Sequence, residues 1–412
     1  MKRFKSTLGI ILAIVMVSMT IFPATVAHAA GTMAFSVGTD YGGLFGIDTS
    51  SDATNARDLY TIAGYNSYAS TAPTVSIMKG NFNNGTKRMK SDILFFSGHG
   101  NYNNVSFNYK GKDGNYATGV WYTTDCTTTD GYNMVGLSGN MSSVKLVTFA
   151  ACLTASNNDN NITAKAVSYG ADTAVGWSSE INAGSHSNWL ARYNDKLATG
   201  STVLQAVTYA NSFTYLDSDV KDARIYGNRS LVIKLTSKAA ILDEEMALGK
   251  IVVKSPSITK VNNEITEASV VSAACANIMN FDPNDYEVNI YEICDGCYTV
   301  DFIFTVDGVR TNSCYTMTII DGKIVEIVDN TVAFDKAELK STISQFDIAS
   351  NAEVMSAARN ATNSSELKSP TKQEVMYYYD IENDSFQKVV FTVYQFDGTE
   401  AVGKDVYIEK IK

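Results

Sequence analysis

Two residues in the first half of the chain, a histidine and a cysteine, could together carry out nucleophilic chemistry. Each stands at the end of an apolar run. His99 ends "DILFFSGH", between Gly98 and Gly100, and Cys152 ends "VKLVTFAAC". A thiol of ordinary pKa is only a few per cent ionised at neutral pH, and a neighbouring imidazole can accept its proton and later protonate a leaving group. We therefore expect a nucleophile and a general base, provided that the fold brings the two residues together.

The N-terminus limits which histidines are available. The chain has 412 residues and three histidines, at 28, 99 and 186. Residues 1–29 combine early basic residues, an apolar run and Ala27-His28-Ala29, which predicts an export signal that is cleaved after Ala29. We expect a secreted, extracellular or cell-surface protein that has lost His28. It should have no transmembrane segment, because no later apolar run approaches about 18 residues.

Composition excludes several classes of protein. The net charge is −10, and clustered Lys and Arg are missing, which argues against a nucleic-acid partner. Hydrophobic residues make up 45% of the chain, enough to bury real cores. Six cysteines are few for an exported chain of this length, so we do not expect a disulfide scaffold.

The elements that must position His99 and Cys152 follow an α/β pattern. Strands are predicted at 33–38, 92–98, 144–151 and 172–177, and helices at 51–65, 161–171, 187–200 and 202–213. The strands are continuously apolar, which is typical of a mostly parallel sheet covered by helices on both faces. Ser51 or Asp52 is the expected cap of the first helix. Since the carboxyl ends of parallel strands share one edge, we expect His99 and Cys152 at the same rim.

The rest of the chain has a different character. Residues 97–143 show no clear period and are expected to form a long surface excursion. Residues 238–262 are expected to be a linker, and residues 263–412 an α+β accessory region with antiparallel sheets. In that region, 263–330 and 331–412 look like two rounds of a helix followed by strands, including helices near 335–345 and 352–361. The pattern resembles small PepSY-type or cystatin-like modules.

The two apolar runs carry a family resemblance. "DILFFSGHG" followed by "VKLVTFAAC" resembles the signature blocks of clan CD cysteine peptidases, and "SGHG" with "GADTAVGWSSEI" looks most like CHAT-domain and gingipain-type bacterial members. The resemblance covers roughly residues 33–235. It implies a caspase-like α/β/α domain over 30–237, an endopeptidase that acts on protein or peptide substrates, His99 as general base and acid, and Cys152 as nucleophile. No cofactor is implied.

Two further sets of residues follow from this reading. The backbone amides of Gly100 and Cys152 could donate hydrogen bonds to a developing oxyanion. By the resemblance, the specificity pocket would use Asp40 and Glu180 to face a basic side chain and Trp177 as an apolar wall. Cleavage after Arg or Lys is therefore expected.

Several alternatives remain open. Cys152 could be an inert core thiol, His99 a turn residue, and the chain a non-catalytic binding protein on the same scaffold. His186 is expected at a solvated loop position, and residues 156–161 lack the spacing of a calcium loop. The spacing of "CDGC" at 294–297 has two interpretations, a structural cysteine pair across a turn and a redox motif. The structural pair is favoured, because Asp295-Gly296 is typical of a turn. The C-terminal region could inhibit, anchor or target an enzyme.

Overall fold

The computed structural model describes most of the chain after the N-terminal segment. The described residues are 32–40, 47–107, 118–121, 126–127, 133–136, 141–156, 158–234, 249–259, 264–306, 308–331, 372–380, 385–395 and 401–410. The predicted export signal and the helices expected near 335–345 and 352–361 lie outside these residues.

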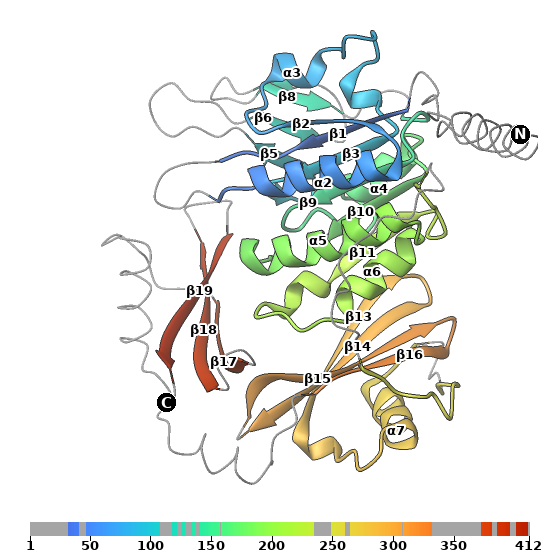
Figure 1. Cartoon of the computed structure of the whole chain (residues 1–412), viewed down its shortest axis with the longest axis vertical. Helices are drawn as coiled ribbons and strands as arrows, with labels where there is room; N and C mark the ends of the chain where they lie inside the picture. Colours follow the sequence, from blue (N-terminus) through green and yellow to red (C-terminus); the bar gives the residue numbers. More distant parts are fainter. Residues whose placement is uncertain are drawn as a thin grey trace, which may run out of the picture.

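A six-stranded sheet forms the centre of the first half of the chain (Figure 1). Its strands are β1 (Met33–Val37), β2 (Asn66–Ser70), β3 (Ile93–Ser97), β9 (Leu146–Ala150), β10 (Thr173–Trp177) and β11 (Ala223–Gly227). They lie in the order β2-β1-β3-β9-β10-β11, and only β11 runs antiparallel to its neighbour. Every residue of β1, β3, β9 and β10 is buried, which explains why these strands lack an alternating pattern.

Helices cover both faces of this sheet. The helices are α2 (Ser50–Ala63), α3 (Val75–Lys79), α4 (Ile162–Ser168), α5 (Ala183–Thr199) and α6 (Val203–Asn211). One apolar cluster joins α2, α5 and α6 to one face, and a second joins α3 and α4 to the other. The predicted α/β/α sandwich with a mostly parallel sheet is confirmed. The two edge strands β2 and β11 were missed because their sequences are more polar.

The start of α2 differs from the prediction. The helix begins at Ser50, and Thr49 takes the cap position instead of Ser51 or Asp52. The Thr49 hydroxyl lies 2.9 Å from the carbonyl oxygen of Ser97, at the end of β3. Asp52 therefore falls in the first turn of the helix, and its side chain is available for other contacts.

The excursion over 97–143 contains short strands that the sequence did not reveal. They are β4 (His99–Asn101), β5 (Asn104–Phe107), β6 (Thr118–Trp121), β7 (Cys126–Thr127) and β8 (Asn133–Gly136). They pair in the order β4-β5-β6-β8-β7 as a separate small sheet. Strands of two to four residues are too short to show an alternating pattern, so residue types alone did not indicate them.

In the described part of the C-terminal region, one helix packs against a mostly antiparallel sheet. Its elements are β12 (Gly249–Lys250), α7 (Glu267–Asn277), β13 (Tyr286–Cys294), β14 (Cys297–Val306), β15 (Val309–Ile320), β16 (Lys323–Asn330), β17 (Lys372–Asp380), β18 (Ser385–Gln395) and β19 (Ala401–Lys410). All pairs in this sheet are antiparallel except β15 with β17. α7 packs on β14 and β15 through an apolar cluster. β12, within the predicted linker, pairs with β16.

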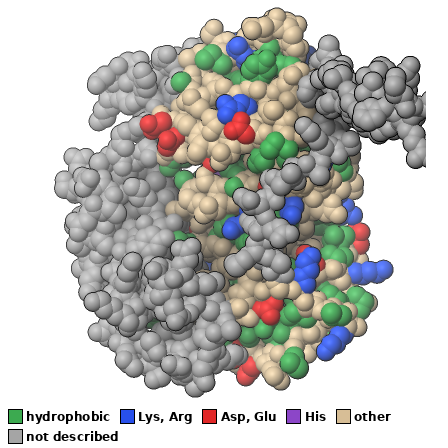
Figure 2. Space-filling view, viewed as in Figure 1, with side chains coloured by type: hydrophobic (Ala, Val, Ile, Leu, Met, Phe, Trp, Pro, Cys, Tyr) green, Lys and Arg blue, Asp and Glu red, His purple; other side chains and the backbone are tan. Residues whose placement is uncertain are grey.

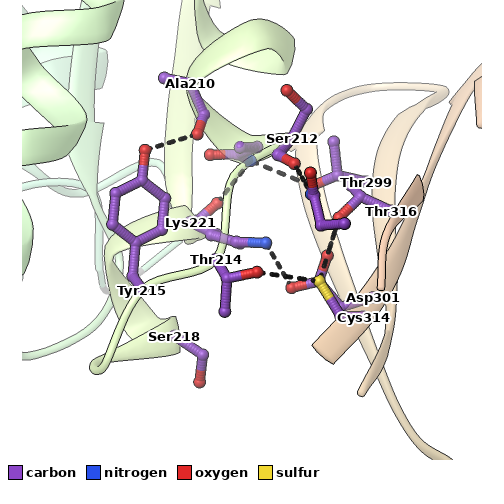
Figure 3. A network of polar contacts seen from close by, with 12 residues as sticks. Ala210, Ser212, Thr214, Tyr215, Ser218, Lys221, Thr299, Asp301, Cys314 and Thr316 are labelled. Carbon is purple, nitrogen blue, oxygen red and sulfur yellow. Dashed lines mark hydrogen bonds and ion pairs between the residues drawn. The ribbon is translucent and has the colours of Figure 1, made fainter. Parts of the chain in front are cut away.

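A buried polar network joins the two halves (Figure 3). Lys221, at the end of the 3-10 helix η2 (Ser218–Lys221), forms an ion pair of 2.6 Å with Asp301 of β14, and both side chains are only 2% exposed. Asp301 also accepts a hydrogen bond from Thr316, and Asn211 donates one to Thr299. A buried charge needs its partner, so this network holds the C-terminal sheet against the first half of the chain.

On the described part of the face drawn in Figure 2, neither positive nor negative side chains are concentrated in one area. Lys and Arg side chains are interspersed with Asp and Glu over the described part of this face. Within the described residues, no helix is both long enough and apolar enough to cross a membrane.

Candidate active site

The structure brings His99 and Cys152 to the same edge of the central sheet. β3 and β9 are parallel neighbours, with Ser97 opposite Ala150, and His99 and Cys152 each follow two residues later. The Gly98 N–H donates to the carbonyl oxygen of Ala150 over 3.2 Å, which extends the pairing past the end of the strands. Both residues line one pocket, part of which is open to solvent. We call it the rim pocket.

Gly100 is fixed by close packing against the segment that carries Cys152. A Cβ at Gly100 would lie 2.6 Å from the Cβ of Ala151 and 2.8 Å from the carbonyl oxygen of Cys152. These separations leave room for hydrogen only. The second glycine of "SGHG" thus lets the β4–β5 hairpin lie directly on the cysteine segment.

The turn after Cys152 is held from several sides. Leu153 adopts a left-handed backbone, with φ of 61°, and its N–H donates to the carbonyl oxygen of Ser179. The buried Thr154 hydroxyl accepts the Trp177 N–H at 3.1 Å and lies 3.0 Å from the carbonyl oxygen of Phe149. A non-glycine residue with positive φ is costly, so the contacts around it must impose this turn. They fix the position of the Cys152 backbone.

The environment of the Cys152 thiol favours the protonated, neutral form. Burial raises the pKa of Cys152 to about 12, and the negative charges of Glu180 and Asp217 act in the same direction. The N–H of Ile181, 3.4 Å from Sγ, opposes this by lowering the pKa of the thiol. At neutral pH the sulfur therefore keeps its proton, and attack on a substrate needs a base that removes the proton during the reaction.

His186 lies in the rim pocket, contrary to the expected solvated loop position. It occupies the first turn of α5, is 5% exposed and packs edge-on against Trp177 at 4.4 Å between ring centroids. Burial lowers the pKa of His186 to about 3, and its Nε2 has no hydrogen-bond partner among the described residues. The predicted loop position was wrong because the helix begins before His186. The Asn182 side chain caps α5, so His186 lies inside the helix.

Asp52 is a second pocket residue whose role the sequence did not reveal. It lines the rim pocket at 7% exposure and accepts a 2.7 Å hydrogen bond from the Ser97 hydroxyl and another from Ser187. Burial raises its pKa, and the two hydroxyls partly oppose the shift. An acid in the first turn of a helix usually interacts with the helix dipole, so its residue type gave no signal of a pocket position.

Trp177 does not form the apolar wall that was expected. Its side chain is 0% exposed, and its Nε1–H donates to the carbonyl oxygen of Val220 over 2.8 Å. It packs between His186 and Trp189 beneath the helices. The ring belongs to the core because every residue of β10 is buried, and it supports the pocket from behind through His186.

The two acids expected to select a basic side chain are placed differently from each other. Asp40 is exposed, and its backbone forms an isolated antiparallel β-bridge with that of Asp48. Glu180 is half-buried, and its negative charge raises the pKa of Cys152. Neither lines the rim pocket as described, whereas Asp48 and Asp52 do. The structure therefore brings together His99, Cys152 and two other acids.

The described lining of the rim pocket comes from the first half of the chain. Its described lining comes from residues 47–186, without a residue from the C-terminal strands. Within the described residues, no group of three or more His, Cys, Asp or Glu is arranged to hold a metal ion. In the run 156–161, Asn161 serves as the cap of α4.

Comparisons with known proteins give little at the level of sequence. No family model matches the chain, and no curated protein matches it. Among solved structures, the chain is similar to a complex of the RgpB pro- and mature domains from Porphyromonas gingivalis. The sequence identity is 11% and the TM-score 0.31, over 92% of this chain and 69% of that chain. Function must therefore be inferred from the rim pocket itself.

Proposed function

We propose that the chain is an exported cysteine endopeptidase in which Cys152 is the nucleophile and His99 the general base and acid. One observation carries the proposal: the two residues line the same pocket, at the carboxyl ends of adjacent parallel strands. This edge is where α/β sheets place their catalytic groups. Both residues follow buried strands, so their backbones are fixed by the core.

The raised pKa of Cys152 determines the order of the proton transfers. The sulfur is neutral before the reaction, so His99 takes its proton as Sγ attacks the substrate carbonyl carbon. The same imidazole then protonates the leaving amine, and an acyl-enzyme remains. Water, deprotonated by His99, hydrolyses the thioester and restores the thiol. Each step keeps the net charge in the pocket small, as its buried surroundings require.

Other groups near the two residues have roles consistent with this reaction. The backbone amides of Gly100 and Cys152 are the proposed donors to the oxyanion, and the close packing at Gly100 holds the two segments together. The Nε2 of His186 is buried without a partner in the described residues, so a polar group of a bound peptide could satisfy it.

We propose cleavage after Arg or Lys, supported by the acids at the pocket. Asp48 and Asp52 both line it, and a cationic side chain placed there would pair with the Asp48 carboxylate and favour the ionised form of Asp52. The predicted acids Asp40 and Glu180 remain proposals as more distant contributors. Asp48, which is exposed, can adjust to a substrate more readily than Asp52, which is held by two serine hydroxyls.

The test compares the mature protein with a Cys152→Ala variant, using Cys275→Ala as the matched control because Cys275 is exposed on α7. Peptide libraries and the protein itself are incubated, and the fragments are identified by mass. We expect cleavage after Arg or Lys by the parent and the control, and none by Cys152→Ala. Cleavage that survives in Cys152→Ala would overturn the assigned nucleophile, and cleavage after acidic or apolar residues would overturn the specificity.

The second candidate function is a non-catalytic binding protein on the same scaffold. The observation that favours it is the thiol environment, since burial holds Cys152 in its unreactive form. Alkylation distinguishes the two functions. In a peptidase, iodoacetamide modifies Cys152 near neutral pH faster than it does in a His99→Ala variant. Equal and slow labelling of both proteins would favour the binding function.

A further inference from the structure

A pair of cysteines lies at the tip of the β13–β14 hairpin, far along the chain from the rim pocket. Cys294 and Cys297 are directly opposite each other, and Asp295 and Gly296 form the turn between them. Gly296 has a φ of 73°, which lets the chain reverse within two residues. Directly opposed residues of an antiparallel pair have Cα atoms about 4.5–5.5 Å apart, within the range that a disulfide spans. We call this site the hairpin tip.

An arginine from the first half of the chain contacts both sulfurs. Nη1 of Arg229 lies 2.7 Å from Sγ of Cys297 and 3.9 Å from Sγ of Cys294, and it also donates to the carbonyl oxygen of Asp295. Its other terminal nitrogen pairs with Asp321 at 3.2 Å. Because the guanidinium is always charged, it places a permanent cation beside the two thiols.

These contacts favour ionisation of one thiol. A hydrogen bond from Cys297 and the charge of Arg229 lower the pKa of Cys294 to about 7, although partial burial opposes the shift. Cys294 is half-buried, whereas Cys297 is buried. The more accessible sulfur is therefore also the better nucleophile, and the buried one is held next to it.

We propose that Cys294 and Cys297 form a reversible disulfide by exchange with small-molecule disulfides such as oxidised glutathione. The Cys294 thiolate attacks one sulfur of the small disulfide and releases one thiolate, which leaves a mixed disulfide on Cys294. Cys297 loses its proton to solvent, attacks Sγ of Cys294 and releases the second thiolate. The two protein thiols are oxidised, and one small disulfide is reduced to two thiols, so no other oxidant is needed.

Arg229 sets the balance between the two forms. It stabilises a thiolate in the reduced pair but has no anionic sulfur to contact once the disulfide forms, although its contacts with Asp295 and Asp321 can remain. Stabilising the reduced form makes a disulfide easier to reduce. The hairpin tip should therefore respond to the thiol–disulfide ratio outside the cell rather than stay permanently oxidised.

The test uses the full mature chain with Cys152→Ala, so that peptidase activity and its thiol do not interfere. The protein is equilibrated in mixtures of reduced and oxidised glutathione, alkylated and analysed by peptide mass. We expect both hairpin-tip thiols to lose reactivity together, with a loss of two hydrogens in one peptide that contains both. Cys275 should stay alkylatable at ratios that oxidise the pair.

Two variants separate the parts of the proposal. Cys297→Ser should trap a mixed disulfide of glutathione on Cys294, because the resolving thiol is gone. Arg229→Gln should oxidise more readily, with the midpoint ratio of [GSH]² to [GSSG] shifted by about tenfold, equivalent to about 30 mV. Hairpin-tip thiols that remain fully alkylatable at every ratio, or Cys297→Ser that carries no glutathione, would overturn the proposal whether or not the chain is a peptidase.

Discussion

The rim pocket and the hairpin tip each hold a cysteine, but they favour opposite states of ionisation. In the rim pocket, burial raises the pKa of Cys152 and Asp52 and lowers that of His186, so all three groups are pushed toward their neutral forms. At the hairpin tip, Cys297 and Arg229 lower the pKa of Cys294. Desolvation dominates at the first site, and a hydrogen bond and a fixed cation dominate at the second.

This difference indicates two kinds of thiol chemistry in one chain. A neutral thiol reacts quickly only when a base removes its proton in the same step, so reaction at Cys152 depends on His99. A thiol that is already ionised reacts with any accessible disulfide. The five predictions below test this contrast in order of expected effect.

The largest effect is expected from His99→Ala in the rim pocket. Because Cys152 is protonated at neutral pH, loss of the base should lower kcat/KM on a cleaved peptide by about 10²–10⁴-fold. Steady-state assays across pH measure this loss. The variant should regain activity as pH rises toward the pKa of the thiol, and a proportional loss at all pH values would contradict the role of His99 as the base.

Next is the buried ion pair that joins the two halves of the chain. Lys221→Met leaves Asp301 buried without its cation, which should cost about 3–5 kcal/mol of unfolding free energy in urea titrations. The double variant Lys221→Met/Asp301→Leu should recover much of the loss. If the C-terminal sheet loosens, alkylation of Cys294 should change through its contact with Arg229, while Cys152 keeps its reactivity. Equal changes at both thiols would show that the two sites are not separate.

The neutral character of the rim pocket predicts a loss of stability in acid through His186. Its pKa is 6.5 when unfolded and about 3 when folded, so the unfolded chain binds a proton between these values and the folded chain does not. The stability from the neutral imidazole is fully present above about pH 6.5 and is lost as pH falls toward 3. His186→Phe should flatten this part of the curve, by on the order of 3 kcal/mol at its acid end. An unchanged slope would contradict the burial of the ring.

Gly100→Ala tests the contact that positions Cys152. The added methyl would overlap with Ala151 and with the Cys152 carbonyl oxygen, so we expect a loss of about 1–3 kcal/mol in thermal or chemical unfolding. Gly85→Ala is the control for backbone strain. Its added methyl would meet no atom within 4 Å, but its φ of 84° is unfavourable for alanine, so it can lose stability without affecting Cys152. Peptidase activity should fall only for Gly100→Ala. Activity equal to the parent would show that the contact does not position the nucleophile.

The smallest effect is expected at the hairpin tip. Arg229→Gln should return the pKa of Cys294 toward the ordinary thiol value and lower its alkylation rate at pH 7 by about tenfold. The rate is followed by peptide mass after short pulses of iodoacetamide. Arg57→Gln is the control, because Arg57 pairs with Asp58 on the surface of α2. An unchanged rate would mean that Cys297, rather than Arg229, is the main stabiliser of the thiolate.

The sequence was informative where burial is uniform along an element. β3 and β9 are continuously apolar, so their positions and parallel arrangement could be predicted, and with them the two ends at His99 and Cys152. It was less informative where function depends on helices that fold over the sheet edge. Asp52 and His186 enter the rim pocket from the first turns of α2 and α5, and their neighbours in sequence do not show where those turns lie.

The error at Trp177 has a related cause. A large ring at the end of a strand can face a pocket or the core, and periodicity does not distinguish these when every position is buried. The packing of Trp177 against His186 and Trp189 decides for the core. The hairpin-tip pair was correctly placed across a turn, but its partner Arg229 is 65 residues earlier than Cys294 and could not be inferred from spacing.

By itself, the sequence determined which residues stand at the ends of the central strands, because long apolar runs must be buried and side chains that follow them emerge at one edge. Only the tertiary structure decided the chemical state of those residues. Ionisation depends on the water removed and the charges brought near by segments distant in the chain. Thus α5 and the 178–182 segment surround Cys152 in the rim pocket, whereas Arg229 reaches the thiols of the hairpin tip.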